Sequence, residues 1–452
     1  MPIEPSVVEG ALQIVKHCLG LAPNQQLVIL ADESTIEPSV ALAEAADALG
    51  VAQTVFLVPI SVQRRIPAQV DLSWLIQKAA REARAILTCV NARPSCLPFR
   101  QRILETHWTA HTRIGHMPGV TCEILKLANV DFGQLVRNCW CVETVLARGR
   151  TLEFVSRDRS GQAHSLTADI GGWERLPVAS DGLINDGAWG NVPSGETYIA
   201  PIEGTAEGTI VINGSIPGMV INTDSELVLT FERGRLTRVE PAGSPATRWL
   251  YETQINKAQA AGDLEWSNLA EIGIGLNPAV TRLSGNMLFD EKAGGTAHIA
   301  LGTNVYMGGM VYSTIHCDMV VRQPTLLVDG KVLLKEGILT YSEPVWHDRH
   351  TEVSLEDSLL RVAERVARSG VQARSAPDGR LQRVLRPEPG RLSACFVGDS
   401  QTSQFAQALY ALIPAQDDGV RITELAGQAN MDVDLARRVL HILHSYDLVR
   451  VI

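Results

Sequence analysis

The chain has 452 residues, of which 45% are apolar and 20% are charged. This is the composition of a globular protein with two or three domains, and it excludes a disordered or fibrous chain. The net charge of −10 argues against nucleic acid as the main partner. No apolar run is as long as a membrane span, and the N-terminus lacks a secretory signal. Eight scattered cysteines without a Cys-x-x-Cys pair indicate reduced thiols, so we expect a cytoplasmic protein.

Residues 1–140 alternate helical and strand patterns. Helical patterns cover residues 7–19, 37–49 and 75–84, and short apolar runs cover residues 26–31, 54–58 and 85–90. Buried-type strands that alternate with helices predict a parallel sheet covered on both faces. No Gly-x-Gly-x-x-Gly follows the first strand, which argues against a dinucleotide site. We expect an α/β domain over residues 1–140.

From about residue 140 the pattern changes to short alternating strands. They cover residues 151–155, 209–212, 227–231, 325–328 and 332–334, and the dipeptides Asn213-Gly214, Arg233-Gly234 and Asp329-Gly330 predict hairpin turns between them. One helical pattern covers residues 293–301 and ends at Gly302. We expect a β-rich α+β domain over residues 141–350.

The C-terminal part returns to helical patterns. Residues 351–391 contain a predicted helix over 354–368 and then a linker. Residues 392–452 carry helical patterns over 404–412, 422–429 and 433–445 and then a terminal strand, which is the outline of a winged helix-turn-helix. The second helix of this module has Arg437 and Arg438 but no dense basic face, so contact with a protein or dimerisation is favoured over DNA binding.

The pair His316 and Asp318 is the first candidate for chemistry. It lies in a predicted strand over 312–321, where alternation puts both side chains on one face and Cys317 on the other. An imidazole and a carboxylate make half of a metal site, and Glu271 and His298 lie upstream. On the dipeptide alone, a hydrogen-bonded core pair is the better interpretation.

Four separated segments support the metal site. They are Pro193-Ser-Gly-Glu-Thr-Tyr-Ile-Ala-Pro201, Ala270-Glu-Ile-Gly-Ile-Gly-Leu-Asn-Pro278, Asn286-Met-Leu-Phe-Asp-Glu-Lys-Ala-Gly-Gly-Thr-Ala-His-Ile-Ala-Leu-Gly302 and His316-Cys-Asp318. In this order and spacing they resemble the metallopeptidases of the aminopeptidase T family. The motifs span about residues 185–340. The region after about residue 345 has no counterpart in that family.

The resemblance implies a ligand set and a reaction. The metal ligands fall on Glu196, Glu271, His298, His316 and Asp318, with Glu196 and Glu271 also catalytic. A further ligand of the family, a tyrosine, falls here on Val305, one position before Tyr306. We expect Tyr306 and Arg282 to contact the substrate. This mixed set of oxygen and nitrogen donors suits one or two ions of zinc, manganese, cobalt or iron.

The resulting hypothesis is a metal-dependent hydrolase that cleaves an amide or peptide bond. The substrate would be a peptide or a small amide, the resemblance implies a homodimer, and the C-terminal module could bind a protein partner. One alternative is the related family of 2,5-dihydroxypyridine 5,6-dioxygenases, whose iron site would use His316 and Asp318 and has a histidine where this chain has Glu271. Another alternative is a non-catalytic regulator on an enzyme scaffold.

Overall fold

A computed structural model describes residues 3–64, 82–96, 99–100, 103–104, 112–171, 175, 177–222 and 224–340, and the strands at 380–383, 420–421 and 449–451. The described residues form two compact units. Unit 1 draws on Met1–Arg137, Ser180–Gly195 and Asn277–Thr281, and unit 2 on Asn138–Ala179, Glu196–Leu276 and Arg282–Ile452. Both units are therefore assembled from separated stretches of the chain.

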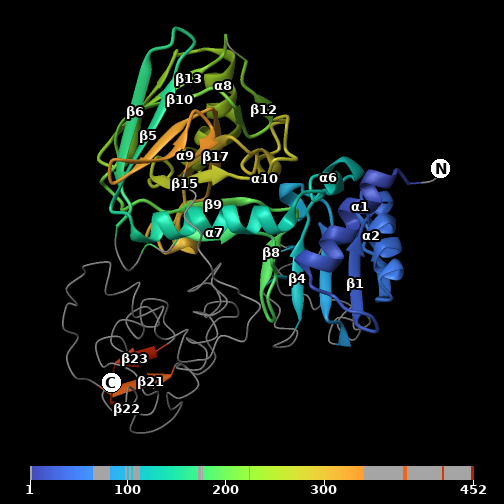
Figure 1. Ribbon diagram of the computed structural model, residues 1–452. Helices are drawn as coiled ribbons and strands as arrows, with labels where there is room; N and C mark the ends of the chain where they lie inside the picture. The colour runs from blue at the N-terminus through green and yellow to red at the C-terminus, as the bar shows by residue number, and fades with distance from the viewer. Residues whose placement is uncertain are drawn as a thin grey trace. The chain divides into compact units, whose positions relative to one another are not determined.

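Unit 1 is an α/β structure (Figure 1). In chain order it contains α1 (Pro5–Gln13), the π-helix η1 (Ile14–Cys18), β1 (Gln26–Ala31), α2 (Ile36–Ala48), β2 (Ala52–Leu57), α3 (Ile60–Gln63), β3 (Ala85–Cys89), the 3-10 helix η2 (Pro94–Cys96), β4 (Arg113–His116), α6 (Cys122–Lys126) and β8 (Trp189–Asn191). The helix α7 (Phe132–Arg148) begins in unit 1 and continues into unit 2.

The sheet of unit 1 has the order β2-β1-β3-β4-β8, and its neighbouring strands run parallel. The predicted parallel sheet is confirmed. Strands β1 and β3 are buried on both faces. Phe99 and Ile103 pack on the face that carries Val28, Leu30 and Ile86. The prediction of a buried strand over 54–58 was wrong in one respect: β2 is the edge strand, and Val55 and Leu57 are 41% and 56% exposed.

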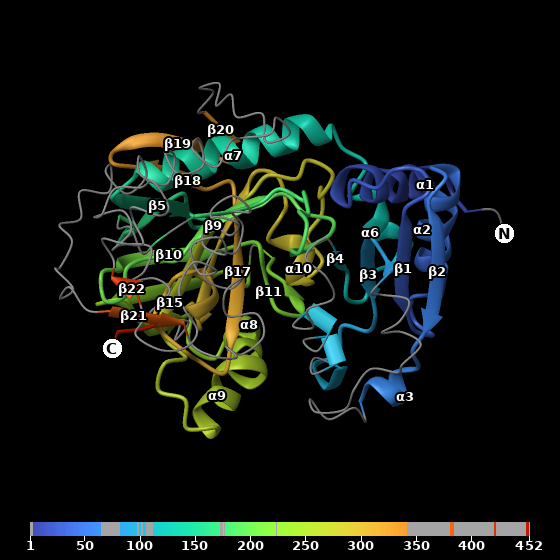
Figure 2. The same cartoon turned by 90° about the horizontal axis from the view of Figure 1, so that it is seen from below.

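Unit 2 consists mainly of strands (Figures 1 and 2). In chain order it contains β5 (Thr151–Arg157), β6 (Ala163–Asp169), β7 (Val178–Ser180), β9 (Glu196–Ile199), β10 (Glu207–Ile212), β11 (Ser215–Ile216), β12 (Met219–Val220), β13 (Leu227–Glu232), β14 (Arg235–Glu240), α8 (Pro245–Leu250), the π-helix η3 (Tyr251–Ile255), α9 (Asn256–Ala260), β15 (Leu269–Gly275), α10 (Met287–Asp290), β16 (Thr296–Gly302), the 3-10 helix η4 (Val305–Met307), β17 (His316–Arg322), β18 (Thr325–Val328), β19 (Lys331–Lys335) and β20 (Ile338–Leu339).

The strands of unit 2 from β5 to β20 form two sheets. One has the order β14-β13-β10-β6-β5-β18-β19-β20 and the other β12-β11-β17-β16-β15-β9-β7. The predicted hairpins at Arg233-Gly234 and Asp329-Gly330 are confirmed, and all four residues have positive φ, as this tight turn requires. The predicted hairpin at Asn213-Gly214 was wrong, because there the chain passes from β10 in the first sheet to β11 in the second.

The predicted helix over 293–301 was also wrong. Residues Thr296–Gly302 form strand β16, which pairs with β15 on one side and β17 on the other. The segment is mostly apolar and is buried along its whole length, and a buried run of this length fits either type of element. Pairing with two neighbouring strands decides in favour of the strand, because it satisfies the buried backbone groups.

Several predicted elements lie outside the described residues. These are most of the helix over 75–84 and the helices of the C-terminal part. There, only β21 (Arg380–Arg383), β22 (Val420–Arg421) and β23 (Val449–Val451) are described, and they form a three-stranded sheet with β21 in the centre. β21 falls within the segment predicted as a linker. Within the described residues, no helix has the length and hydropathy needed to cross a membrane.

Candidate metal centre

Strand β15 carries the first carboxylate of a cluster of polar groups on one face of its sheet. A register shift between Leu269 and Glu271 marks a β-bulge, a feature that re-aims a side chain. Beyond it the sequence Glu-Ile-Gly-Ile-Gly alternates, so Glu271, Gly273 and Gly275 share one face. This face therefore carries one carboxylate followed by two positions without a side chain.

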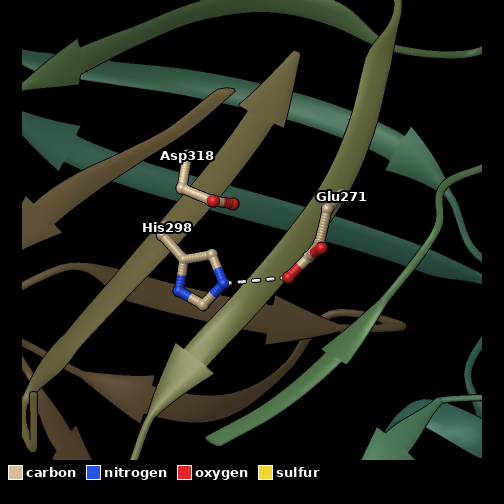
Figure 3. A group of neighbouring side chains, drawn as sticks. All are labelled: Glu271, His298 and Asp318. Carbon is tan, nitrogen blue, oxygen red and sulfur yellow. Dashed lines mark hydrogen bonds and ion pairs between the residues drawn. The ribbon is translucent and has the colours of Figure 1, made fainter. Parts of the chain in front are cut away.

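Glu271 and Asp318 approach each other across the intervening strand β16. Glu271 is in register with Ala300, and Ala300 is in register with Asp318. The small Ala300 side chain leaves room for the two carboxylates above it. Figure 3 shows both of them beside the imidazole of His298.

The two imidazoles reach the same carboxylates. His298 is fully buried and places Nε2 at 3.0 Å from Glu271 Oε1. A Cβ atom on Gly273 would lie 2.1 Å from that nitrogen, so the glycine makes room for the ring. His316 places Nε2 at 3.2 Å from Glu271 Oε2 and 3.3 Å from Asp318 Oδ1. Its Nδ1 lies 2.9 Å from the carbonyl oxygen of Thr303, which orients Nε2 toward the cluster.

Glu196 joins the cluster from strand β9, together with a lysine. Glu196 is in register with Gly275, and its Oε2 lies 3.8 Å from His298 Nε2. Its Oε1 accepts a hydrogen bond of 2.9 Å from Lys292 Nζ. Lys292 is 1% exposed and also forms an ion pair with Glu291. Glu196 thus stands between an ammonium and an imidazole.

The predicted ligands converge from four strands. Glu196 comes from β9, Glu271 from β15, His298 from β16, and His316 and Asp318 from β17. Ligand atoms of Glu271, His298 and Asp318 all lie within 4.8 Å of one another. The prediction that His316 and Asp318 share a face is confirmed by their common contact and by the burial of Cys317 on the opposite face.

Electrostatic coupling within the cluster is strong. Among the protein groups alone, burial raises the pKa of Glu271, but hydrogen bonds from His298 and His316 outweigh it and lower the pKa to about 2. Burial lowers the pKa of His298, but Glu271 and the nearby carboxylates raise it to about 9. Burial raises the pKa of Glu291 to about 8, with Lys292 opposing. The ionised form of each buried carboxyl group is therefore stabilised by the imidazole or ammonium groups beside it.

The donor set fits a divalent cation. When the imidazoles are neutral, as metal ligands must be, the carboxyl groups of Glu196, Glu271, Glu291 and Asp318 are opposed by a single fixed cation among the described residues, Lys292. Glu196 Oε2 is buried and has no hydrogen-bond partner in the part of the chain that the structure describes. Such excess negative charge is costly to bury without a cation. A mixed set of carboxylates and imidazoles is a suitable coordination environment for zinc, manganese, cobalt or iron.

Of the two predicted substrate contacts, Arg282 does not join this cluster in the described chain, and the contact of Tyr306 stays a prediction. Arg282 is exposed, and no ion pair joins it to the ligands within the described chain. Tyr306 lies in the backbone of η4 beside Val305, and its side chain is not among the described groups. Asp290 accepts hydrogen bonds from the backbone N–H groups of Ser284 and Gly285 at 2.8 and 2.7 Å.

Sequence reasoning missed one group at the centre, Tyr198. Tyr198 shares a face with Glu196 and is in register with Gly273. Burial and the carboxylates of Glu271 and Glu196 raise its pKa well above the ordinary value. The two-residue strand repeat from Glu196 could have revealed Tyr198. Lys292 follows Glu291 in the third motif, but only the fold shows that its ammonium points inward.

The fold and the cluster together define a two-unit protein with a candidate metal centre on a β-sheet of unit 2. In a comparison with known families, the model described as NicX, 2,5-dihydroxypyridine 5,6-dioxygenase, matches residues 165–341. That stretch contains all five predicted ligands. A comparison of the sequence with curated proteins gives no match.

Two solved structures share the fold. The 2,5-dihydroxypyridine dioxygenase of Pseudomonas putida KT2440 has a TM-score of 0.57 and 20% identity, over 76% of this chain and 99% of that chain. AmpT of Thermus thermophilus has a TM-score of 0.51 and 16% identity, over 75% of this chain and 100% of that chain. The resemblance to both families that the motifs indicated is thus confirmed. At this level of identity the likeness establishes the fold alone.

Proposed function

We propose that this protein is a metal-dependent hydrolase that cleaves an amide or peptide bond, as an aminopeptidase does. The observation that carries the proposal is the composition of the centre, where Glu196, Glu271 and Asp318 meet two imidazoles. A centre in which carboxylates outnumber imidazoles favours Lewis-acid chemistry on a carbonyl. A non-heme iron oxygenase typically uses two histidines and one carboxylate.

We assign roles to the residues from their contacts. Glu271, Asp318, His298 and His316 would hold the ion, which when bound activates water and polarises the carbonyl of the scissile bond. Glu196 keeps Oε2 without a hydrogen-bond partner in the described chain, 3.8 Å from His298 Nε2, so it is the carboxylate placed to accept a proton from water.

Tyr198 is the group that we assign to the developing oxyanion. Its hydroxyl has no hydrogen-bond partner within the described residues, and its side chain shares the face of Glu196 and lies in register with Gly273. A phenol held there can donate a hydrogen bond to an oxygen that gains charge during the reaction.

Ring cleavage is the second candidate function. It is favoured by the match of residues 165–341 to the 2,5-dihydroxypyridine 5,6-dioxygenase model. His298, His316 and Asp318 could also form a two-histidine, one-carboxylate set. Glu271 would then be an additional carboxylate in contact with both imidazoles, at 3.0 and 3.2 Å.

One experiment separates the two reactions. The purified protein is loaded in turn with zinc, manganese, cobalt and ferrous iron. Release of the N-terminal residue from short peptides and aminoacyl amides is then measured beside oxygen uptake with 2,5-dihydroxypyridine. We expect hydrolysis without oxygen uptake. Iron-dependent oxygen uptake without hydrolysis would overturn the proposal in favour of ring cleavage.

Two variants assign the activity to the centre. We expect Glu271→Ala to reduce turnover by more than about 100-fold. Loss of a group that only orients a metal ligand lowers activity by about 10- to 100-fold, and loss of a ligand itself should cost more. The matched control is Glu252→Ala, which removes an exposed carboxylate from η3. Equal turnover in Glu271→Ala and the wild type would show that the activity does not come from this centre, and no turnover in either would support a non-catalytic protein.

A further inference from the structure

We propose that the ammonium of Lys292 takes the place of a second cation, so that the centre holds one divalent ion and not two. This inference rests on the proposed metal-dependent function. It assigns the number of ions, and it makes Lys292 the residue that sets it.

Lys292 is placed as a fixed internal cation. Its side chain is 1% exposed, and its Nζ lies 2.9 Å from Glu196 Oε1 and pairs with Glu291. Lysine is almost never fully buried unless it is paired, and an ammonium has three protons to donate. Two carboxylates from different elements therefore bind Lys292 in the way that two carboxylates bind a shared metal ion.

The backbone holds this lysine in position. Lys292 follows α10, whose last residue, Asp290, is fully buried and bonded to the N–H groups of Ser284 and Gly285. On the other side, a Cβ atom on Gly275 would lie 2.2 Å from the carbonyl oxygen of Ala293. Because Gly275 has no side chain, the turn that carries Lys292 lies directly on β15. This contact and the hydrogen bonds of Asp290 position the ammonium beside Glu196.

The carboxylates consequently divide into two pairs. Glu196 and Glu291 contact the ammonium, whereas Glu271 and Asp318 contact the imidazoles, at 3.0 to 3.3 Å. The group whose ligand atoms lie within 4.8 Å of one another, Glu271, His298 and Asp318, belongs to the imidazole side.

A second ion on the lysine side would meet a like charge. To bind Glu196 and Glu291 together it would have to lie beside the ammonium that already contacts both. Repulsion between two cations at such short range in a buried site is strong. Glu196 Oε2 keeps its assigned role as proton acceptor, because Lys292 engages Oε1.

The test is the number of ions per chain. Protein stripped with a chelator is titrated with Mn²⁺ by calorimetry, and the bound metal is counted by mass spectrometry after desalting. We expect one Mn²⁺ in the wild type and in Lys292→Arg, which keeps the charge. We expect two in Lys292→Met and Lys292→Gln, which remove it, with the second ion bound at least about tenfold more tightly than by the wild type.

Each outcome decides a different question. Two ions in the wild type, or one ion in both neutral variants, would overturn the inference and leave the metal-dependent function intact. No ion in the wild type would instead overturn the proposed function itself. Lys292→Gln keeps an N–H donor for Glu196, so it serves if Lys292→Met does not fold. The electron paramagnetic resonance spectrum of Mn²⁺ gives an independent readout, because two adjacent ions couple and one does not.

Discussion

Glu271 is the side chain whose surroundings say most about the centre. It is 5% exposed, and both of its oxygens face an imidazole, Oε1 that of His298 and Oε2 that of His316. A carboxylate at this depth is destabilised unless positive or donating groups contact it. Glu271 in turn raises the pKa of both His298 and His316, so its removal would change the charge state of both imidazoles.

Gly273 is the residue that makes this arrangement possible. We expect Gly273→Ala to weaken metal binding by roughly 10- to 100-fold, which is the range for changes to the groups that orient a ligand. The physical reason is that the added Cβ would lie 2.1 Å from Nε2 of His298 and force the ring away from Glu271. The measurement is the dissociation constant of Mn²⁺ by calorimetry.

The control for this substitution is Gly133→Ala. In helix α7 the nearest atom to the new Cβ would be Arg137 Nη1 at 3.3 Å, the end of a flexible side chain. We expect this variant to bind metal like the wild type. Wild-type affinity in Gly273→Ala would show that the ring of His298 is not a ligand.

At the scale of elements, β16 shows where local sequence is not sufficient. Its Ala-rich segment was predicted as a helix, yet it forms the strand between β15 and β17. In a helix, His298 and Ala300 would not lie on the same face, and Ala300 would not be in register with Glu271 and Asp318. The strand thus supplies both the histidine and the small residue over which the carboxylates meet.

Ala300 tests the importance of this alignment. We expect Ala300→Val to destabilise the fold by about 1–3 kcal/mol through overpacking and also to weaken metal binding. The control is Ala297→Val on the opposite face of β16, where the residue is equally buried but paired with Ile274 and Val321. Both variants should lose stability in urea denaturation, but only Ala300→Val should lose Mn²⁺ affinity. Equal loss of affinity would contradict this account of the face.

At the scale of the whole molecule, the cluster makes the stability of the fold depend on pH. The pKa of His298 is raised from 6.5 to about 9, so its contribution is fully present below pH 6.5 and is lost as the pH rises through 9. The pKa of Glu271 is lowered from 4.5 to about 2, so its contribution is present above pH 4.5 and is lost as the pH falls through 2.

We therefore expect the melting temperature of chelator-treated protein to fall as the pH rises from 6.5 to 9. The raised pKa of Glu291 acts in the same direction. Saturating Mn²⁺ should remove this decline, because the ion replaces the proton as the partner of Glu271. The measurement is thermal unfolding by circular dichroism with and without the ion. A melting temperature of the chelated protein that stays level or increases over this range would contradict the coupling.

The division into two compact units could not be predicted from the order of elements along the sequence, as strand β8 shows. Strand β8, Trp189–Asn191, completes the parallel sheet of unit 1 by pairing with β4, although it lies between strands of unit 2 in the sequence. Nothing in its short sequence distinguishes it from a loop. Its pairing is long-range, and only the folded chain brings the two strands together.

The sequence by itself determined the parallel sheet, the hairpins at Arg233-Gly234 and Asp329-Gly330, and the common face of His316 and Asp318, because each depends on a local period or turn preference. The five candidate ligands were also identified from motifs. Only the tertiary structure decided that His298 lies on a strand, that Gly273 makes room for its ring, and that Lys292 binds Glu196. These depend on register between strands distant in the chain, which no local pattern encodes.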